Sequence, residues 1–240
     1  MPLVTVPLVN VAPATPRSQL VTVDVLGLAF DFTPGQAVLI GAHGQPDRRP
    51  YSIASSPERV SETHQLELLI ALDDGGAIGP HLPAARPGML VDMDGPLGTF
   101  MFPEAPTQPR LLFVAGGTGI APLRAMIDHV LRRDLSRELS LLYSARRADE
   151  FAFLDELVRH ADAARLELHL TVTRDESTTW AGRRGRIGRS HFESVLHDAS
   201  ATLCFVCGPR AMVTDATLTL QELGVPESAI RTEAWATLKE

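Results

Sequence analysis

A cluster of glycines lies between an apolar run and an amphipathic stretch, and it is the segment of the chain best suited to bind an anion. Residues 116–122 read Gly-Gly-Thr-Gly-Ile-Ala-Pro and follow the apolar run 111–115. Because glycine has no Cβ atom, the backbone N–H groups of Gly116, Gly117 and Gly119 can approach phosphate oxygens closely. The positive end of a following helix dipole favours the same negative charge. The segment therefore predicts a strand, a turn and a helix N-terminus that bind the pyrophosphate of a dinucleotide.

The residues after these glycines are typical of a helix. Thr118 lies within the turn, and Pro122 suits a first helical turn because proline has no N–H group to donate. Apolar side chains then recur at helical spacing, which predicts a helix packed on a sheet. They are Leu123, Met126, Ile127, Val130 and Leu131. The glycines lack the Gly-x-Gly-x-x-Gly spacing of the common dinucleotide motif, and glycine at such a junction also has a purely steric use. The turn alone therefore does not distinguish a pyrophosphate-binding site from a junction that needs glycine only for steric reasons.

Two further distinctive segments lie on either side of this turn. Residues 49–52 read Arg-Pro-Tyr-Ser, and residues 207–212 read Cys-Gly-Pro-Arg-Ala-Met after a second apolar run. In this order the three segments resemble those of the ferredoxin-NADP reductase family of flavoenzymes. The resemblance extends from about Phe32 to Trp235, which is nearly the whole chain.

The pattern of apolar segments divides the chain at residues 103–109, where three prolines interrupt helix and strand patterns. Before this point, short segments separated by turns predict an antiparallel barrel. They are Leu20–Val25, Ala37–Ile40, Leu66–Leu72 and Leu90–Met93, with 1–11 as a first strand. After it, strands that alternate with helical stretches predict a doubly wound parallel sheet. They are 111–115, 139–144, 166–173, 203–207 and 230–234. With the resemblance, this predicts a flavin-binding β-barrel domain at 1–105 and an NAD(P)-binding α/β domain at 110–240.

The resemblance implies that the barrel binds FAD, with FMN as the less favoured alternative. Tyr51 would lie on one face of the isoalloxazine ring, Ser52 would hydrogen-bond near the flavin N5, and Arg49 would bind the flavin phosphate. An arginine fork matches phosphate geometry, and an aromatic face packs well on a ring. Pro50 and Ile53 belong to the same cofactor-binding segment. The alternative is an ordinary strand with one surface arginine.

A second flavin-phosphate element of the family reads Gly-x-x-Ser at a helix start. The matching residues here are Gly76, Ala77, Ile78 and Gly79, followed by Pro80. Glycine stands where the family has serine, and the missing hydroxyl removes a hydrogen bond worth about 0.5–1.5 kcal/mol. Proline also lacks a backbone N–H group. This departure leaves FMN open beside FAD.

The chain has two cysteines, Cys207 at the start of the downstream motif and Cys204 in the apolar run before it. The resemblance places Cys207 beside the reacting C4 carbon of the nicotinamide, where a small polarisable side chain lets the ring approach the flavin. Gly208 and Pro209 would form the turn into a helix that carries Met212. Cys204 and Cys207 are three residues apart in a predicted strand and point to opposite faces, which disfavours a dithiol. The alternative for Cys207 is a packing role, since free cysteine is commonly buried.

The segment Ile230–Trp235 resembles the closing strand of the family, where an acidic residue and an aromatic residue come close to the flavin and the nicotinamide. Glu233 and Trp235 occupy these places. Together with Ser52 and Cys207, they are the candidate catalytic residues. Trp235 would act as a gate that the nicotinamide displaces, or alternatively would seal a domain interface.

Arginines decide the choice of nucleotide. Bacterial NADPH-using relatives carry arginines at places that resemble Arg146, Arg174 and Arg186, where they bind the 2′-phosphate. Each charge-assisted hydrogen bond contributes roughly 1.5–3 kcal/mol, so two of them would favour NADPH by about 100-fold or more. The alternative is a solvated basic loop. NADPH is therefore the expected nucleotide, and NADH remains possible.

Composition limits the partners of the protein. The 240 residues carry a net charge of −7, and residues 1–109 contain 5 Arg and Lys against 11 Asp and Glu. An acidic first half does not favour nucleic acid. Two cysteines cannot supply the four thiolates of a typical iron–sulfur cluster, and the eight histidines show no metal-ligand spacing. No apolar stretch reaches the roughly 20 residues of a membrane helix, and the N-terminus has no basic flank. We expect a cytoplasmic protein without a metal site.

These observations predict a flavin-dependent oxidoreductase. Hydride would pass from C4 of NADPH, or of NADH, to flavin N5, and electrons would then pass singly to a separate carrier protein. Ferredoxin, flavodoxin and the iron–sulfur component of an oxygenase are the expected carriers. One alternative is a reductase of small acceptors such as free flavin or quinones. The other is a non-catalytic flavin-binding subunit of a larger complex.

Overall fold

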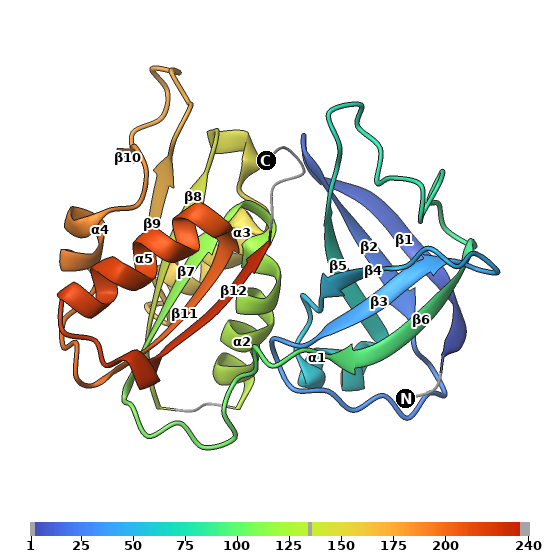
Figure 1. Ribbon diagram of the computed structural model, residues 1–240, viewed down its shortest axis with the longest axis horizontal. Helices are drawn as coiled ribbons and strands as arrows, with labels where there is room; N and C mark the ends of the chain where they lie inside the picture. Colours follow the sequence, from blue (N-terminus) through green and yellow to red (C-terminus); the bar gives the residue numbers. More distant parts are fainter. Residues whose placement is uncertain (1–2, 134–135, 236–240) are drawn as a thin grey trace. The chain divides into compact units, whose positions relative to one another are not determined.

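The computed structural model describes residues 3–133 and 136–235. The chain forms two compact units, each containing one six-stranded sheet. The first unit comprises Met1–Phe102 and Ala121–Arg133, and the second comprises Pro103–Ile120 and Asp134–Glu240. Figure 1 shows an antiparallel sheet built from the first part of the chain and a parallel sheet with helices built from the second. This arrangement confirms the predicted fold class.

The first unit is a closed antiparallel sheet. Its strand order is β4-β3-β6-β1-β2-β5, and every neighbouring pair is antiparallel. The strands are β1 (Val4–Thr15), β2 (Ser18–Asp24), β3 (Ala37–Ala42), β4 (Arg49–Ser52), β5 (Gln65–Ala71) and β6 (Leu90–Leu97). An isolated antiparallel bridge between Ile53 and Leu68 joins the end of β4 to β5. The two edges of the sheet therefore meet, as in a barrel.

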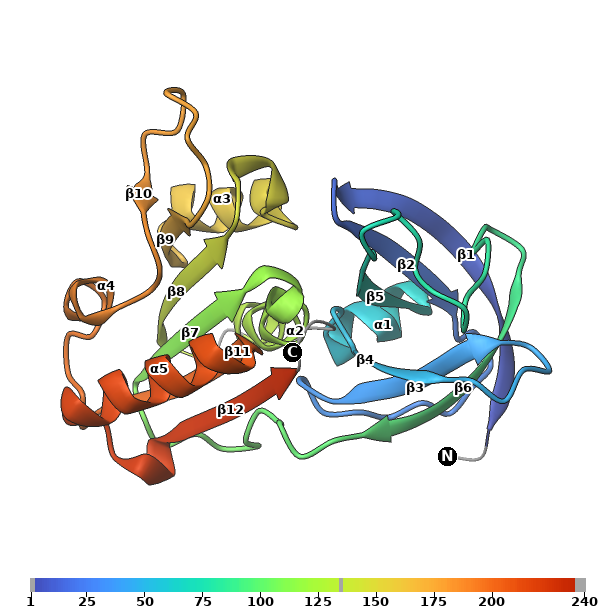
Figure 2. The same ribbon diagram turned by 45° about the horizontal axis from the view of Figure 1, so that its top comes forward.

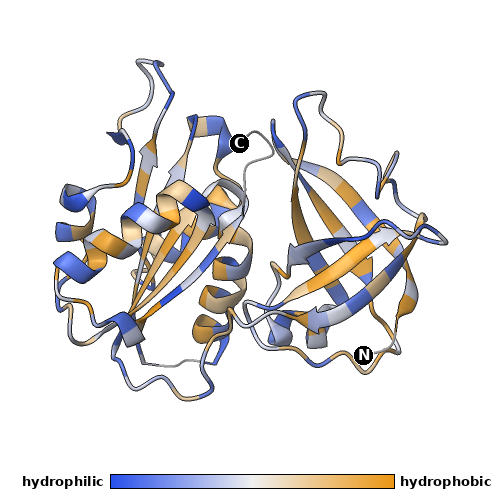
Figure 3. Ribbon diagram, viewed as in Figure 1, coloured by the Kyte–Doolittle hydropathy of each residue, from blue (hydrophilic) through white to orange (hydrophobic). Residues whose placement is uncertain are grey.

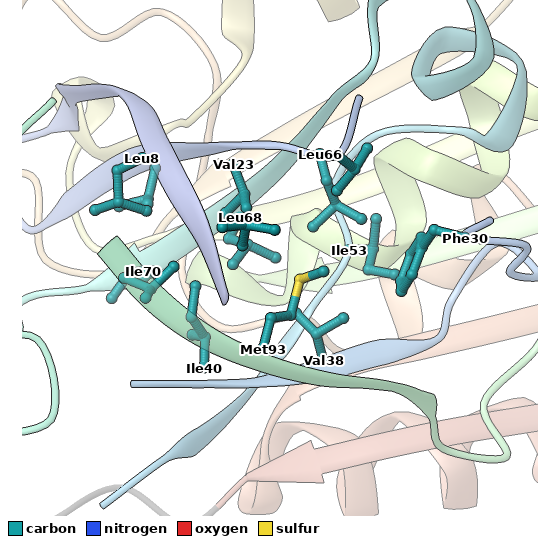
Figure 4. Close-up of a cluster of buried hydrophobic side chains, with 14 of the residues drawn as sticks. Leu8, Val23, Phe30, Val38, Ile40, Ile53, Leu66, Leu68, Ile70 and Met93 are labelled. Atoms are coloured by element: carbon teal, nitrogen blue, oxygen red, sulfur yellow. The ribbon is translucent and has the colours of Figure 1, made fainter. Parts of the chain in front are cut away.

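The interior of this barrel is filled by aliphatic side chains from all around the sheet. Figure 4 shows Leu8, Val23, Ile40, Leu68 and Met93 pointing toward one another from five different strands. Each of them is at most 1% exposed. Alternate residues of a strand point to opposite faces, so one face of each strand can supply this core. The barrel thereby gives β4, which carries the Arg-Pro-Tyr-Ser motif, a rigid support.

The second unit is a parallel sheet of order β10-β9-β8-β7-β11-β12. Its strands are β7 (Arg110–Gly116), β8 (Glu138–Ala145), β9 (Glu167–Val172), β10 (Arg183–Arg184), β11 (Thr202–Pro209) and β12 (Ile230–Trp235). The central strands β7 and β11 are apolar along almost their whole length (Figure 3), which is typical of parallel strands covered on both faces. The strand order reverses between β7 and β11. Such a switch point is where doubly wound sheets bind their ligands.

In the described part of the second unit, three α-helices and three short 3₁₀ segments accompany the sheet. The helices are α3 (Leu154–Asp162), α4 (Arg189–Glu193) and α5 (Arg210–Glu222), and the 3₁₀ segments are η1 (Gly117–Gly119), η2 (Ala148–Glu150) and η3 (Glu227–Ala229). Helix α5 runs along β11 and β12 on one face of the sheet, and α3 lies beside β9 on the other face (Figures 1 and 2).

Two helices belong to the first unit: α1 (Pro57–Thr63), which the sequence did not predict, and α2 (Ile120–Arg132). The predicted apolar stripe of α2 is buried, with Leu131 only partly so. From Ala121 onward, however, the helix is grouped with the barrel, although its first residue follows the glycine turn of the second unit. The predicted domain ranges place the whole helix in the second domain, and they stay a prediction.

A polar stripe attaches α2 to the barrel. Arg124, which is buried, donates to the carboxylate of Glu67 at 2.6 Å. One turn later, the buried carboxylate of Asp128 accepts hydrogen bonds from Ser56 Oγ at 2.6 Å and from Nε and Nη2 of Arg59 at 3.1 Å. Ser56 is also the N-cap of α1 and accepts from the backbone N–H of Arg59. These contacts explain why α2 belongs to the first unit.

We expect Asp128→Asn to lower the free energy of unfolding by about 3 kcal/mol, because it leaves the Arg59 guanidinium without its buried counter-charge. Burial raises the pKa of Asp128, but hydrogen bonds from Arg59, Ser56 and Arg132 and the charge of Arg59 together outweigh burial and hold the pKa below its usual value. The stabilisation is therefore complete above the unfolded-state pKa and is lost as pH falls through the folded-state pKa. Urea unfolding at several pH values measures this loss.

The matched control is Glu62→Gln. Glu62 accepts from Arg132 Nη1 at 2.7 Å, but its side chain is 61% exposed. An exposed ion pair contributes at most about 1 kcal/mol. Equal destabilisation by the two variants would contradict a special role for the buried carboxylate.

Candidate active site

The glycine turn lies at the switch point of the parallel sheet. Strand β7 ends at Gly116, the turn Gly117–Gly119 follows, and α2 begins at Ile120. A Cβ atom on Gly116 would lie 2.6 Å from Met212 Sδ, and one on Gly119 would lie 2.6 Å from the carbonyl carbon of Cys207. Both distances are too short for any side chain. The two glycines therefore allow β7 and the turn to approach the end of β11 closely.

A buried tyrosine fixes the shape of this turn. Tyr143, in β8, is fully buried, and its hydroxyl donates to the carbonyl oxygen of Gly117 at 3.1 Å. The same hydroxyl oxygen accepts from the backbone N–H of Ala152 at 3.1 Å. Burial raises the pKa of Tyr143, so the phenol stays protonated and remains a donor. Sequence reasoning missed this residue, although a tyrosine inside an apolar strand must find such partners.

Cys207 and Glu233 are paired across neighbouring strands. They lie opposite each other in the register of β11 and β12, and Cys207 Sγ is 3.7 Å from Glu233 Oε2. Burial, with the nearby charge of Glu233 as a second cause, raises the pKa of Cys207 well above its usual value. The thiol is therefore protonated and donates to the carboxylate. This arrangement suits a compact, neutral side chain and not a thiolate nucleophile.

Neither cysteine should react with iodoacetamide in the native protein below pH 9. Cys204 and Cys207 are both fully buried, and burial raises the pKa of Cys204 to about 12. Mass spectrometry should show two modified thiols after denaturation and none before it. Fast modification of Cys207 in the native state would contradict the protonated, buried thiol.

The glycine turn and the end of β11 are also contacted by Trp235, Met212 and the Gly208–Pro209 turn. Trp235 pairs with Pro209 in the register of the sheet, and its Cη2 atom would lie 2.7 Å from a Cβ atom on Gly119. A Cβ atom on Gly208 would lie 2.5 Å from Met212 Cε. The indole ring therefore lies against the glycine turn, and the methionine covers two glycines. Helix α5 begins directly after Pro209, where a helix was predicted.

The three predicted phosphate-binding arginines follow three neighbouring parallel strands. Arg146 comes directly after β8, Arg174 comes two residues after β9, and Arg186 comes two residues after β10. The backbone N–H of Arg174 donates to the carbonyl oxygen of Arg146 at 2.8 Å. Among residues 3–133 and 136–235, none of the three guanidinium groups has a hydrogen-bond or ion-pair partner. They are thus available to an anion at the carboxyl edge of the sheet.

The neighbouring Arg184 is different. Its guanidinium donates to the backbone carbonyl oxygens of Asp175, Ser177 and Trp180, at 2.6 Å for Ser177 and 3.0 Å for Trp180. The loop after β9 is therefore held in shape by one arginine.

In the barrel, the Arg49–Ser52 motif forms the edge strand β4, which pairs with β3 alone. Pro50 is exposed on this edge, where its missing N–H group costs no ladder hydrogen bond. The Tyr51 hydroxyl lies 2.7 Å from Nε2 of His81, and the two rings are stacked with centroids 5.7 Å apart. Burial raises the pKa of Tyr51 to about 12. Ile53 is buried in the barrel core.

The segment that matches the second flavin-phosphate element does not begin a helix, unlike the family element. Residues 76–79 lie in a loop, and the backbone N–H of Leu82 donates to the carbonyl oxygen of Gly79 at 3.2 Å, which closes a turn. Gly79 has φ +111°, a conformation that side chains rarely adopt, and this explains why serine is absent here. Ile78 packs against the barrel core, and Ala77 donates its N–H to Asp73 at 2.9 Å. The loop brings Gly79 beside Arg49.

Comparisons with known proteins identify the family. Residues 20–102 match the oxidoreductase FAD-binding domain, and residues 113–217 match the oxidoreductase NAD-binding domain. Ferredoxin–NADP reductase B of Sorangium cellulosum is 32% identical over 219 residues, which are 87% of each chain. The chain belongs to the ferredoxin-NADP reductase family. It is a flavoprotein reductase that uses FAD and a pyridine nucleotide, as the sequence predicted.

Other known proteins are similar to this chain in sequence or in structure. The NADPH oxidoreductase of Mycobacterium tuberculosis is 29% identical over 194 residues, which are 79% of this chain and about half (49%) of that protein. The cytochrome P450 reductase GcoB of Amycolatopsis has a similar structure, with a TM-score of 0.85, 25% identity, and coverage of 98% of this chain and 71% of that one. A ferredoxin NADP+ reductase from Neisseria gonorrhoeae shares the fold, with a TM-score of 0.82 at 20% identity.

The residues of this reductase suit both cofactors chemically. In the barrel, a guanidinium group, an aromatic ring and a hydroxyl group follow one another in β4 as Arg49, Tyr51 and Ser52. In the parallel sheet, a glycine turn follows β7, and Arg146, Arg174 and Arg186, whose guanidinium groups have no partner among the described residues, follow β8, β9 and β10. No helix in the described part of the chain has the length and apolar character of a membrane span.

Proposed function

We propose that this reductase takes hydride from NADPH in preference to NADH, transfers it to FAD, and passes electrons singly to a separate carrier protein in the cytoplasm. The observation that carries the proposal is the glycine turn at the strand switch point, bordered by Cys207 and Trp235. FAD supplies a ring that accepts hydride at N5 and releases electrons one at a time. The protein supplies binding, orientation and exclusion of water.

The barrel residues are assigned to FAD. Arg49 binds its phosphate, Tyr51 covers one face of its ring system, and Ser52 hydrogen-bonds near N5. The ring of Tyr51 is held by the contact with His81, so its face is oriented before the cofactor binds. Such preorganisation reduces the entropy lost on binding. In the loop 76–79, the N–H groups of Gly76 and Ala77 already donate to Asp73, so the N–H groups of Ile78 and Gly79 are assigned to the phosphate.

The parallel sheet residues are assigned to the nucleotide. Gly116, Gly117, Thr118 and Gly119 present N–H groups to the pyrophosphate, and Pro122 lies in the helical turn that follows. Arg146, Arg174 and Arg186 bind the 2′-phosphate. Their uncommitted guanidinium groups support this assignment, because a phosphate would not have to displace existing ion pairs.

Cys207, Glu233 and Trp235 are assigned to the nicotinamide. The neutral thiol of Cys207 allows the ring to approach closely, and the Glu233 carboxylate accepts a hydrogen bond from this thiol. Trp235 lies against the glycine turn that is assigned to the nucleotide. We therefore assign it the role of a gate that moves when the nicotinamide binds.

The proposed acceptor is a one-electron carrier. Relatives of this reductase include methane monooxygenase component C of Methylosinus trichosporium and the anthranilate 1,2-dioxygenase electron transfer component of Acinetobacter baylyi. Two cysteines in this chain are too few for a four-thiolate cluster of its own. A ferredoxin, a flavodoxin or the iron–sulfur component of an oxygenase is therefore proposed as the partner.

Anaerobic stopped-flow mixing with NADPH and with NADH tests the proposal. Rapid bleaching of the flavin absorbance, faster or at lower concentration with NADPH, is the expected result. Reduced protein should then be reoxidised by a ferredoxin faster than by free flavin or a quinone. Faster reoxidation by small acceptors would favour a reductase of those acceptors. Bound flavin that neither nucleotide bleaches would indicate a non-catalytic flavin-binding subunit.

A further inference from the structure

A buried histidine in the barrel has one ring nitrogen without a partner. His81 is 0% exposed, and its Nε2 atom lies 2.7 Å from the hydroxyl of Tyr51. Its Nδ1 atom is buried and has no hydrogen-bond partner among the described residues. Unpaired buried polar atoms are rare, because each one loses its hydrogen bonds to water without replacement. The position of this nitrogen therefore requires an explanation.

The hydrogen-bonding roles of the two ring nitrogens follow from their surroundings. Burial lowers the pKa of His81, and the charge of Arg49 lowers it further, so the ring is neutral at pH 7. A phenol is a stronger proton donor than a neutral imidazole, and an imidazole nitrogen is the better acceptor. The Tyr51 hydroxyl therefore donates to Nε2, which leaves the ring proton on Nδ1. The unpartnered atom is a donor.

This donor and a guanidinium group both lie close to the side of Gly79 that carries no side chain. From the point where a Cβ atom on Gly79 would stand, His81 Nδ1 is 3.5 Å away and Arg49 Nη1 is 3.7 Å away. Gly79 contributes no side chain, and Pro80 contributes no N–H group. The two donors thus flank the place where the family motif has a serine hydroxyl. A cation beside a neutral N–H donor suits a phosphate oxygen.

We propose that His81 Nδ1–H binds a phosphate oxygen of the flavin cofactor beside Arg49, and replaces the serine hydroxyl that is missing at position 79. The proposal rests on the assignment of Arg49 and Tyr51 to FAD. It also gives His81 a second effect, because the same ring fixes the hydroxyl of Tyr51. Phosphate binding and the orientation of the stacking ring are linked through one imidazole.

Two substitutions separate the ring nitrogens. His81→Asn keeps an amide N–H near the place of Nδ1 and removes the partner of Tyr51. His81→Gln keeps an amide oxygen near the place of Nε2 and removes the donor to the phosphate. Apoprotein of each is titrated with FAD, FMN and riboflavin, and quenching of flavin fluorescence gives the dissociation constants. Riboflavin has no phosphate and reports on ring binding alone.

We expect His81→Gln to weaken FAD and FMN binding roughly 10- to 100-fold, the range for a hydrogen bond to a charged group, and to change riboflavin binding by less than about 3-fold. We expect His81→Asn to keep most of the affinity for FAD. Unchanged FAD affinity in His81→Gln, or equal losses for FAD and riboflavin, would overturn the proposal.

The variant Arg49→Ala distinguishes a failure of the His81 proposal from a failure of the assignment of Arg49 and Tyr51 to FAD. If Arg49→Ala binds FAD like the wild type, the assignment of β4 to the phosphate is wrong, and the proposed contact between His81 and the phosphate is wrong as well. If Arg49→Ala loses affinity while His81→Gln does not, only the role of His81 is wrong. Where a variant does not fold, the ¹⁵N resonance of Nδ1 in the histidine-labelled wild type gives the answer. It should shift with FAD and not with riboflavin, and the absence of this difference would also overturn the proposal.

Discussion

Gly119→Ala is expected to slow flavin reduction by NADPH by about 100-fold or more, while the barrel still binds FAD. The added Cβ atom would overlap the carbonyl group of Cys207 and lie 2.7 Å from Cη2 of Trp235. The indole ring can move, but a backbone carbonyl in the central strand β11 cannot move without shifting the sheet. The turn must therefore be displaced, and an error of about 1 Å in positioning reactants can cost about 100-fold in rate.

The measurement is the rate of flavin bleaching at saturating NADPH, together with the dissociation constant of the nucleotide. Gly188→Ala is the matched control, because it adds the same methyl group in the same unit. The nearest atom to its Cβ position is 4.0 Å away, and its φ of −153° is ordinary extended backbone. In Gly188→Ala, NADPH should reduce the flavin at the wild-type rate. Equal rates for the two alanine variants would show that close approach of the turn to β11 does not matter for hydride transfer.

The fold could be predicted because its signals are local. The buried strands β7 and β11 appear in the sequence as uninterrupted apolar runs, and glycine or proline follows each of them. Such runs, alternating with helical stretches, are characteristic of a parallel sheet. The segment Arg49–Ser52 could likewise be placed on a strand from its own residues and the resemblance it carries. The roles of individual site residues were predicted from the resemblance, and they stay predictions.

What the sequence did not reveal depends on contacts between distant residues. Asp128 meets Ser56 across 72 positions, and Arg124 meets Glu67 across 57. No local pattern reveals such partners, so α2 looked like an ordinary helix of the second domain. The pairing of Tyr51 with His81, 30 residues apart, was missed for the same reason. Helix α1 has only seven residues, which is too short for a helical period to stand out.

Replacement of both Arg174 and Arg186 by alanine is expected to lower the NADPH-to-NADH ratio of kcat/KM by about 100-fold or more. Both side chains are exposed, follow neighbouring strands and have no partner in the described part of the chain. Two charge-assisted hydrogen bonds of roughly 1.5–3 kcal/mol each account for this factor. Since NADH lacks the 2′-phosphate, its kcat/KM should stay within about 3-fold of the wild-type value.

The control for the arginines is Arg147→Ala, which removes an exposed guanidinium group that already pairs with Asp149 at 3.3 Å. It should leave the nucleotide ratio unchanged, because total positive charge near the edge of the sheet is not what discriminates the nucleotides. Rising ionic strength should raise KM for NADPH more than KM for NADH in the wild type, since salt screens exposed charges. This difference should be smaller in the double variant, where Arg146 alone remains. A double variant with the wild-type ratio would instead identify residues 174–186 as a solvated basic loop, and the preference for NADPH would then have to come from Arg146 or be absent.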